Sequence, residues 1–278
     1  MNTNDILKKA ANGGIAGAGA MSINVMSLMW MRTIVNYQYK NGTSTTDAFK
    51  TLYKNGGITR FYRGVFPALL QGPLARFGDT AANTGVNAYW ENNDYTKDLP
   101  IAIKTFVASC TAASFRVFIM PIDAMKTVKQ VEGKDGLKTL TSKIYKNGPS
   151  VLWHGSLGAS AATFAGFYPW FFTYNTLNAY IPKYDKDNDL SKYLLRNAAI
   201  GFTSTVASDT CSNSIRVVKT IRQSSKEPIT YSEAVNSVIK TDGVKGLLFR
   251  GLNTKILSNG VQGLTFTVMW NLIQDYLN

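Results

Sequence analysis

Six long stretches of the chain are apolar and rich in small residues, and they alternate with more polar segments. Each stretch reaches the ~20 residues that a helix needs to cross a ~30 Å hydrocarbon core. Asparagines interrupt most of them, so we expect each helix to turn a polar face toward water or protein. The pattern predicts an all-α membrane protein with six transmembrane helices around a polar cavity, approximately over residues 11–35, 65–90, 101–128, 156–181, 194–221 and 252–277.

Two short motifs recur three times in phase. One consists of an aromatic residue, a basic residue or His, and a glycine, namely Gly64, Gly155 or Gly251. The other carries a basic residue followed by Thr, at Arg32, Lys126 and Lys219. Because both motifs keep a period of about a third of the 278 residues, they predict three pseudo-repeated helix pairs within a single domain, 1–278. The repeats run approximately over 8–92, 100–182 and 192–278.

Charge refines this picture. The formal net charge is +13, yet only 17% of residues are charged and 45% are hydrophobic, which is unusual for a soluble basic protein. The loops inside the three pairs (37–63, 129–154 and 222–250) carry 15 Lys and Arg against 6 Asp and Glu. Positive loops stay on the side from which they were not exported. The phased repeat disfavours the alternative, a soluble nucleic-acid binder, and no nucleic acid is expected as a partner.

The repeated motifs resemble the signatures of the mitochondrial carrier family. Pro121, Asp123 and Lys126, followed by Gln130, match its P-x-(D/E)-x-x-(K/R) pattern, and the resemblance covers nearly the whole chain. It implies six tilted helices in three pairs, a short amphipathic helix in each matrix loop, and a multi-pass location in the mitochondrial inner membrane. The chain resembles the ADP/ATP carrier type, as a divergent member of the family with degenerate gate motifs.

The resemblance also implies bound lipid. In the family, backbone amides beside the repeat glycines hold cardiolipin phosphate at helix N-termini. Gly64, Gly155 and Gly251 are therefore the expected lipid-binding positions, and membrane lipids are expected partners. His154, the single histidine, is assigned to this lipid site because no second ligand or nucleophile accompanies it.

A matrix gate of three ion pairs is implied by the family, but most of its acids are missing. We expect Asp123 to meet Arg32, while Lys126 faces Arg216 and Lys219 faces Met29. The ordinary three-bridge gate therefore cannot form, and the remaining cations must be hydrated or neutralised by another group. The predicted matrix-gate residues are Arg32, Asp123, Lys126, Arg216 and Lys219.

The helix bends are also expected to be unequal. Pro121 predicts a kink, because proline removes one helical hydrogen bond. Ser27 and Ser214 stand at the equivalent positions and bend a helix only weakly. Cys110 and Cys211 form no metal or disulfide pattern and are interpreted as packing residues.

The family's cytosolic gate has lost its charges as well. Amides occupy the matching positions near the ends of the even helices, where they could hydrogen-bond weakly or merely line a wet helix end, and both interpretations stay open. The predicted cytosolic-gate residues are Asn87, Asn175, Asn178, Asn271 and Gln274.

Charged residues inside the apolar stretches are candidates for solute binding. Arg116 and Asp209 each lie five positions before the signature site and either face the cavity or pair with each other. Arg76, Lys255 and Asn259 complete the predicted cavity set. This set suits a small anionic or zwitterionic solute, whose identity the sequence does not give.

Two functions follow. The first is a metabolite transporter that works by alternating access. The alternative is a non-transporting structural or accessory subunit that keeps the carrier fold inside a larger inner-membrane complex, such as a respiratory complex. No catalytic constellation, nucleotide loop or metal cluster stands out, so neither an enzyme nor a cofactor other than bound cardiolipin is expected.

Overall fold

The computed structural model describes the backbone of residues 3–91, 101–185 and 189–277, and the side chains over most of residues 18–78 and 103–273. The described chain is helical, without a β-strand. Long helices occupy the six predicted apolar stretches. They are α1 (Thr3–Asn41), α4 (Val65–Glu91), α5 (Ile101–Phe118) continued by α6 (Met120–Glu132), α8 (Ser156–Tyr180), α9 (Leu190–Ser224) and α11 (Leu252–Leu277).

Short helices fill the loop inside each pair, as the resemblance implies. Each of the three loops contains at least one amphipathic segment that packs against the end of a long helix. These segments are α2 (Thr45–Lys54), α3 (Gly57–Phe61), η1 (Gly133–Asp135), α7 (Gly136–Asn147), η2 (Pro149–Trp153) and α10 (Tyr231–Phe249).

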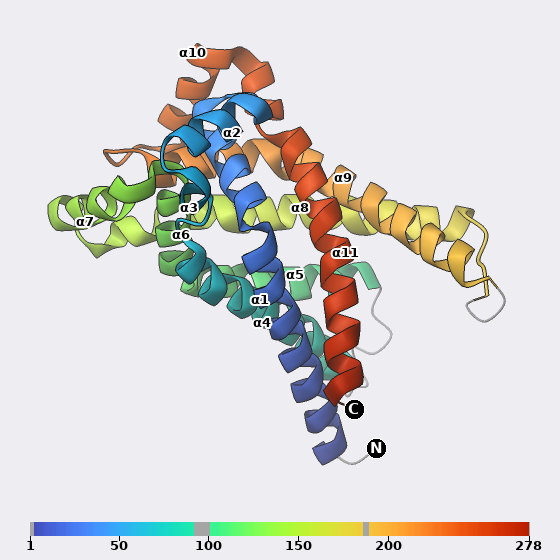
Figure 1. Cartoon of the computed structure of the whole chain (residues 1–278). Coiled ribbons are helices and arrows are strands. Elements are labelled where there is room, and N and C mark those ends of the chain that lie inside the picture. The colour runs from blue at the N-terminus through green and yellow to red at the C-terminus, as the bar shows by residue number, and fades with distance from the viewer. Residues whose placement is uncertain (1–2, 92–100, 186–188, 278) are drawn as a thin grey trace.

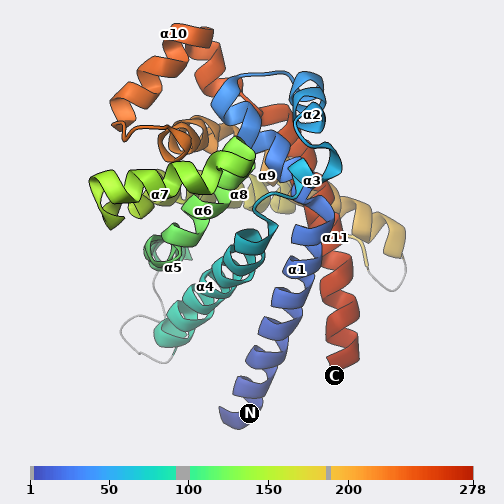
Figure 2. The ribbon, with the colours of Figure 1, turned by 60° about the vertical axis from the view of Figure 1, so that its left-hand side comes forward.

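The long helices form a closed ring. In chain order α1 packs on α4, α4 on α5, α5 on α8, α8 on α9, α9 on α11, and α11 returns to α1. The ring is narrow at the end that carries the short helices, where α1, α6 and α9 contact one another. Away from that end the helices diverge as three pairs, α11 with α1, α4 with α5 and α8 with α9 (Figures 1 and 2).

The helix bends agree with the prediction at Pro121 and Ser214, but the prediction of only a weak bend at Ser27 is wrong. Proline stands in the first turn of α6, and the chain leaves helical geometry at Ile119 (φ −85°, ψ 0°). The prediction of a kink at Pro121 is therefore confirmed. In α1 the backbone is non-helical at Leu28 (φ −114°, ψ 15°), directly after Ser27. That break is sharper than serine back-bonding explains, whereas α9 runs through Ser214 as one helix.

The repeat glycines have one conformation and one kind of neighbour. Gly64, Gly155 and Gly251 have φ values of 90°, 99° and 64°, a region that favours glycine. Each packs against a long helix of the next repeat; for example, a Cβ added at Gly155 would lie 2.9 Å from Cγ of Gln223. The glycine is therefore needed both for the turn into the helix and for the close approach.

Cations of the short segments cap the long helices in a cyclic order. Arg60 donates hydrogen bonds of 2.9 and 2.7 Å to backbone carbonyls at the end of α6. Lys143 donates one of 2.7 Å to the Ser225 carbonyl after α9, and Arg250 donates one of 3.4 Å to the Tyr39 carbonyl in α1. Cations are favourable at helix C-termini, so each repeat stabilises the next one.

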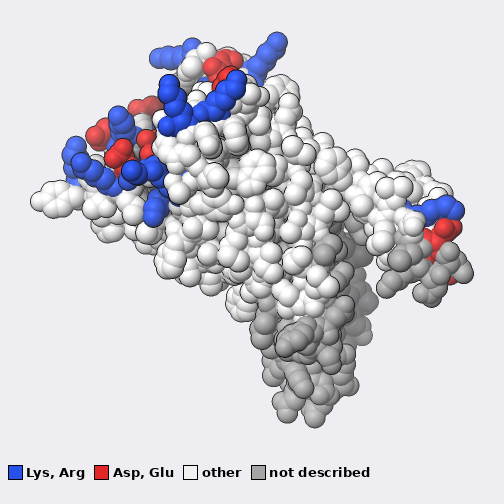
Figure 3. Space-filling model, viewed as in Figure 1, with Lys and Arg blue, Asp and Glu red and all other residues white. Residues whose placement is uncertain are grey.

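Surface charge is segregated. In Figure 3, Lys and Arg gather at the end that carries α7 and α10, with a smaller group at the tip where α8 meets α9. Over the described residues, no helix combines the length and the apolar character that a membrane-spanning segment requires. Cys110 and Cys211 are exposed, so the interpretation of both as packing residues is wrong.

Candidate functional site

A cavity of about 290 Å³ lies where the long helices converge. Residues of α1, α4, α5, α6, α8, α9 and α11 line it, so every repeat contributes to the wall. Its described lining contains a single acid, Asp123, against six cations, so positive charge predominates in the cavity wall. The cations are Arg32, Arg116, Lys126, Arg216, Lys219 and Lys255.

Asp123 forms two ion pairs within the cavity lining. Its Oδ1 lies 2.6 Å from Nζ of Lys126, one turn along α6, and its Oδ2 lies 2.5 Å from Nζ of Lys219 on α9. Gln223 adds a weak hydrogen bond to Oδ2, at 3.4 Å. The Asp123 side chain is 9% exposed, so both lysines are needed to compensate its buried charge.

The predicted partners of these gate residues are wrong. Asp123 meets Lys219, not Arg32, because α6 presents its acid toward α9. Lys126 binds Asp123 and donates to Oε1 of Gln71 at 3.0 Å, so it does not face Arg216 as predicted. Met29 is fully buried, and its Sδ lies 3.5 Å from Nε2 of Gln130. It does not face Lys219 as predicted.

Three of the other cations bind neutral groups. Arg32 donates from Nη2 to Oε1 of Gln262 on α11, at 2.5 Å. Arg216 donates from Nε to the Ser212 hydroxyl on its own helix, at 3.1 Å. Lys255 donates to Oδ1 of Asn259, at 2.9 Å. These amide and hydroxyl contacts orient the cations but are not ion pairs.

The remaining predicted cavity residues fall into two groups. Asp209 is 3% exposed and accepts a hydrogen bond from Nδ2 of Asn259, so its charge reaches Lys255 through that amide. It does not form the ion pair with Arg116 that the sequence left open. Arg76 lies outside the lined cavity, with its guanidinium carbon 4.9 Å from the ring centre of Phe266.

Several polar residues of the site were not in the predicted cavity and gate sets. Gln71 and Gln262 orient Lys126 and Arg32, and Gln223 supports Asp123. Gln223 lies four residues after Lys219, the same spacing that separates Gln130 from Lys126, so this one had a signal in the repeat. Gln71 had a signal as well, because it lies seven residues after the repeat glycine Gly64, whereas Gln262 carries no comparable signal.

Comparison with known proteins decides the family. A sequence profile described as "Mitochondrial carrier protein" matches residues 2–93, 98–185 and 191–278. The chain belongs to the mitochondrial carrier family. The threefold match confirms the predicted triple repeat and carrier fold, while the exact repeat boundaries stay a prediction.

Two curated carriers are similar to this family member. The "probable mitochondrial 2-oxodicarboxylate carrier" of Schizosaccharomyces pombe is 20% identical over 275 residues, covering 96% of this chain and 92% of the relative. The "calcium-dependent mitochondrial ATP-magnesium/phosphate carrier protein 2" of Arabidopsis thaliana is 25% identical over 263 residues, covering 88% of this chain. This chain matches 51% of that relative's length.

The cytosolic gate predicted for this carrier is described at one position. The side chains of Asn87, Asn175, Asn271 and Gln274 lie outside the described residues. Asn178 accepts hydrogen bonds from Nη2 of Arg196 through its backbone carbonyl (3.0 Å) and its Oδ1 (2.9 Å). Arg196 therefore ties the end of α8 to the start of α9, an interaction that the sequence analysis missed.

The predicted lipid positions of the carrier remain predictions, and two features near them differ between repeats. The Gly158 amide in the first turn of α8 already donates to the Tyr231 hydroxyl at 2.8 Å. His154 replaces the basic residue of the other repeats, and burial with the nearby charges of Arg222 and Lys143 lowers its pKa. Under the predicted lipid role of Gly155, both features weaken its attraction for phosphate.

Proposed function

We propose that this carrier-family chain transports a small anion with more than one negative charge across the mitochondrial inner membrane. The observation that carries the proposal is the lining of the central cavity, with six cations and one acid among the described residues. Low-dielectric walls focus such a field and raise the local concentration of anions. The acid is engaged by Lys126 and Lys219. Arg32, Arg216 and Lys255 contact only amide and hydroxyl groups among the described residues, so these three cations can bind a solute anion.

The size of the cavity and the names of the relatives support the same solute class. At about 290 Å³ the cavity is at the lower end of the range for small-molecule sites. One relative is named for 2-oxodicarboxylates and the other for ATP-magnesium and phosphate, and each of these solutes is anionic. The small cavity favours a dicarboxylate or phosphate over a nucleotide.

The outer surface supports a membrane location. Large apolar side chains on the long helices are exposed in the isolated chain, with Phe66 71%, Leu157 73% and Leu264 65% exposed. Exposed apolar side chains of this kind suit contact with lipid or with another protein. Family membership favours the mitochondrial inner membrane, with the basic loops toward the matrix and cardiolipin at the repeat glycines.

Transport in reconstituted liposomes tests the proposal. We expect saturable uptake of a labelled dicarboxylate or phosphate, and we expect Lys255→Gln to reduce it ~10-fold or more, because a charge-assisted contact contributes ~1.5 to 3 kcal/mol. Lys138→Gln, which removes an exposed charge on α7, is the matched control and should transport normally. Equal uptake by both variants would contradict the proposed cavity site.

A second candidate is the non-transporting accessory subunit. Its support is that Asp123 is the single acid among the described gate residues, since alternating access requires different interactions in two states. This candidate predicts that gentle extraction yields a stable larger complex and that liposomes containing the purified chain move no anion. Saturable uptake by the isolated chain would exclude it.

A further inference from the structure

Among the described residues, an ion pair joins two of the helices that meet at the narrow end of the cavity, α6 and α9. Lys219 of α9 binds Asp123 of α6, with Oδ2 and Nζ 2.5 Å apart. Arg32 of α1 and Arg216 of α9 face the same cavity, but their described partners are an amide and a hydroxyl. Where the family pattern has an acid, α9 carries Arg216 and α1 carries Met29. The cavity wall between α1 and α9 therefore has two cations without an ion pair among the described residues, and Asp209, an acid within electrostatic range of Tyr39 on α1, accepts a hydrogen bond from Asn259.

Two donors at this position have no described hydrogen-bond partner. Nε of Arg32 and the hydroxyl of Tyr39 are both buried and unsatisfied. Tyr39 is 3% exposed, lines the cavity and lies within electrostatic range of Arg216. Leaving a buried donor unpaired costs ~1 to 3 kcal/mol, more when it is charged, so the site favours an acceptor that enters from the cavity.

Lys255 brings a third cation to the same place. It projects from α11 and lies within electrostatic range of Asp209 and of the cations Arg216, Arg32 and Lys126. Guanidinium groups bind carboxylate or phosphate with two parallel hydrogen bonds, whereas an ammonium acts as a compact charge. Two arginines and a lysine from three helices therefore suit an anion with several acceptor oxygens and at least two charges.

We propose that phosphate or a dicarboxylate binds between Arg32, Arg216 and Lys255 and takes the place of the gate carboxylates that this chain lacks. The inference rests on the proposed function, because the anion belongs to the proposed cargo class. A bound anion joins α1, α9 and α11 electrostatically, and closure of the narrow end is then coupled to occupancy of the cavity. The bound anion thus supplies the negative charge that the missing gate carboxylates would provide.

Thermal unfolding of the purified full chain in detergent tests the site. Inorganic phosphate and malonate serve as probes, with sodium chloride at matched ionic strength as the reference. We expect each probe that binds to raise the unfolding midpoint by roughly 4 to 8 °C at saturation. Arg216→Gln should lose most of this rise, and whatever remains measures the general salting effect of the anion on the protein. Lys138→Gln should retain the full rise.

A carboxylate built into the chain gives the decisive comparison. Arg216→Glu should raise the midpoint without any added anion and respond little to phosphate or malonate, because its own carboxylate lies among Arg32 and Lys255. The proposal is overturned if Arg216→Glu and Arg216→Gln behave alike without anion, or if Arg216→Gln keeps the full anion response. A response to one probe alone identifies the ligand chemistry as phosphate or carboxylate.

Transport measured on the same samples separates this inference from the proposed function. If the wild-type chain shows the anion response but transports no anion in liposomes, the site stands and the transport proposal fails. If the chain transports an anion but Arg216→Gln keeps the full thermal response to it, transport stands and the gate site fails.

Discussion

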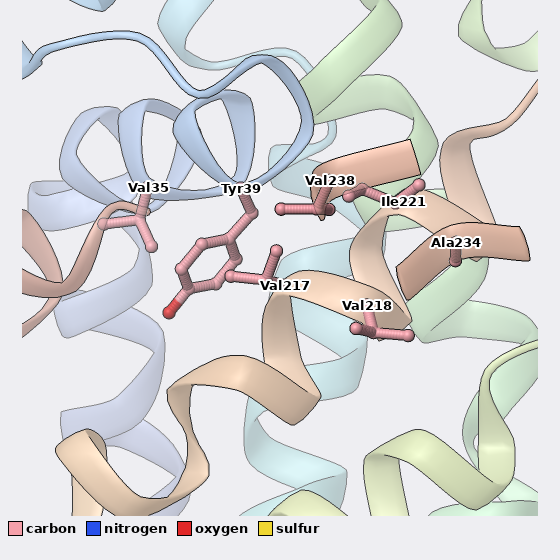
Figure 4. Close-up of a cluster of buried hydrophobic side chains, with 7 residues drawn as sticks. All are labelled: Val35, Tyr39, Val217, Val218, Ile221, Ala234 and Val238. Atoms are coloured by element: carbon pink, nitrogen blue, oxygen red, sulfur yellow. The ribbon is translucent and has the colours of Figure 1, made fainter. Parts of the chain in front are cut away.

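The two contacts that α9 makes near the narrow end differ in kind. Toward α6, Lys219 and Gln223 surround the Asp123 carboxylate, and the contact is ionic. Toward α1, the contact is apolar: Figure 4 shows the ring of Tyr39 against Val217 within a cluster of valine, isoleucine and alanine side chains. The hydroxyl of Tyr39 points away from that cluster.

This difference matters for opening the narrow end. An ionic contact can exchange its partners for water or for another charge, so its strength depends on what enters the cavity. An apolar cluster opens only by exposing its area to water, at ~25 cal/mol per Å². The α1–α9 contact is therefore the more constant element, and the ionic contact together with the cationic site is where a solute can act.

The largest expected effect comes from breaking the ionic contact. Asp123→Asn leaves Lys126 and Lys219 buried without their counter-charge, and we expect the free energy of unfolding to fall by ~3 to 5 kcal/mol. The thermal unfolding midpoint of the purified protein measures this loss. Asp135→Asn removes an exposed acid of the same repeat and should change the free energy by less than ~0.5 kcal/mol.

A double variant sharpens the interpretation. Adding Lys219→Met to Asp123→Asn removes one of the stranded charges, so we expect part of the lost stability to return. The reference is the free energy of unfolding that Lys219→Met alone removes. If Lys219→Met removes the same amount when it is added to Asp123→Asn, the two residues do not interact as the structure describes.

The apolar elements and turns could be predicted from the sequence because their signals are local. Pro121 marks the break before α6, and the repeat glycines mark the turns into α4, α8 and α11, since proline and glycine act through their own backbone geometry. The triple period then places these elements relative to one another without knowledge of any contact.

The ion pairs could not be predicted, because they depend on how each helix is rotated and tilted. The rotation of α6 about its own axis decides whether Asp123 meets Lys219 or Arg32, and the spacing of the motif is the same in both cases. In the structure Asp123 meets Lys219. Arg32 binds Gln262, which lies 230 positions away in a stretch without a motif. The exposed positions of Cys110 and Cys211 follow from the same rotations.

An intermediate effect is expected from opening the apolar contact. Val217 is fully buried between Tyr39 and α10, and Val217→Ala removes two methyl groups from a packed cluster. We expect a loss of about 2 kcal/mol, which should not change when salt is added, whereas the loss caused by Asp123→Asn should. Val244→Ala, on an exposed side chain of α10, is the matched control. A strong salt dependence for Val217→Ala would argue against a purely apolar contact.

The smallest effect is expected at the start of α10, which supplies Ala234 and Val238 to the apolar cluster. The Thr230 hydroxyl accepts from the Glu233 amide while the Glu233 carboxylate accepts from the Thr230 amide, which forms a capping box. Thr230→Ala should therefore cost ~1 kcal/mol, measured by thermal unfolding at neutral pH.

The pH dependence of that cap has a defined sign. The Thr230 hydrogen bonds lower the pKa of Glu233, so its stabilising effect is fully present above the ordinary glutamate pKa and is lost as the pH falls through the lowered value. The difference in unfolding midpoint between the wild type and Glu233→Gln should accordingly shrink as the pH is lowered from about 7 to about 3. A difference that stays constant over this range would mean that the carboxylate charge of Glu233 does not stabilise α10, and that the apolar contact depends on side-chain packing alone.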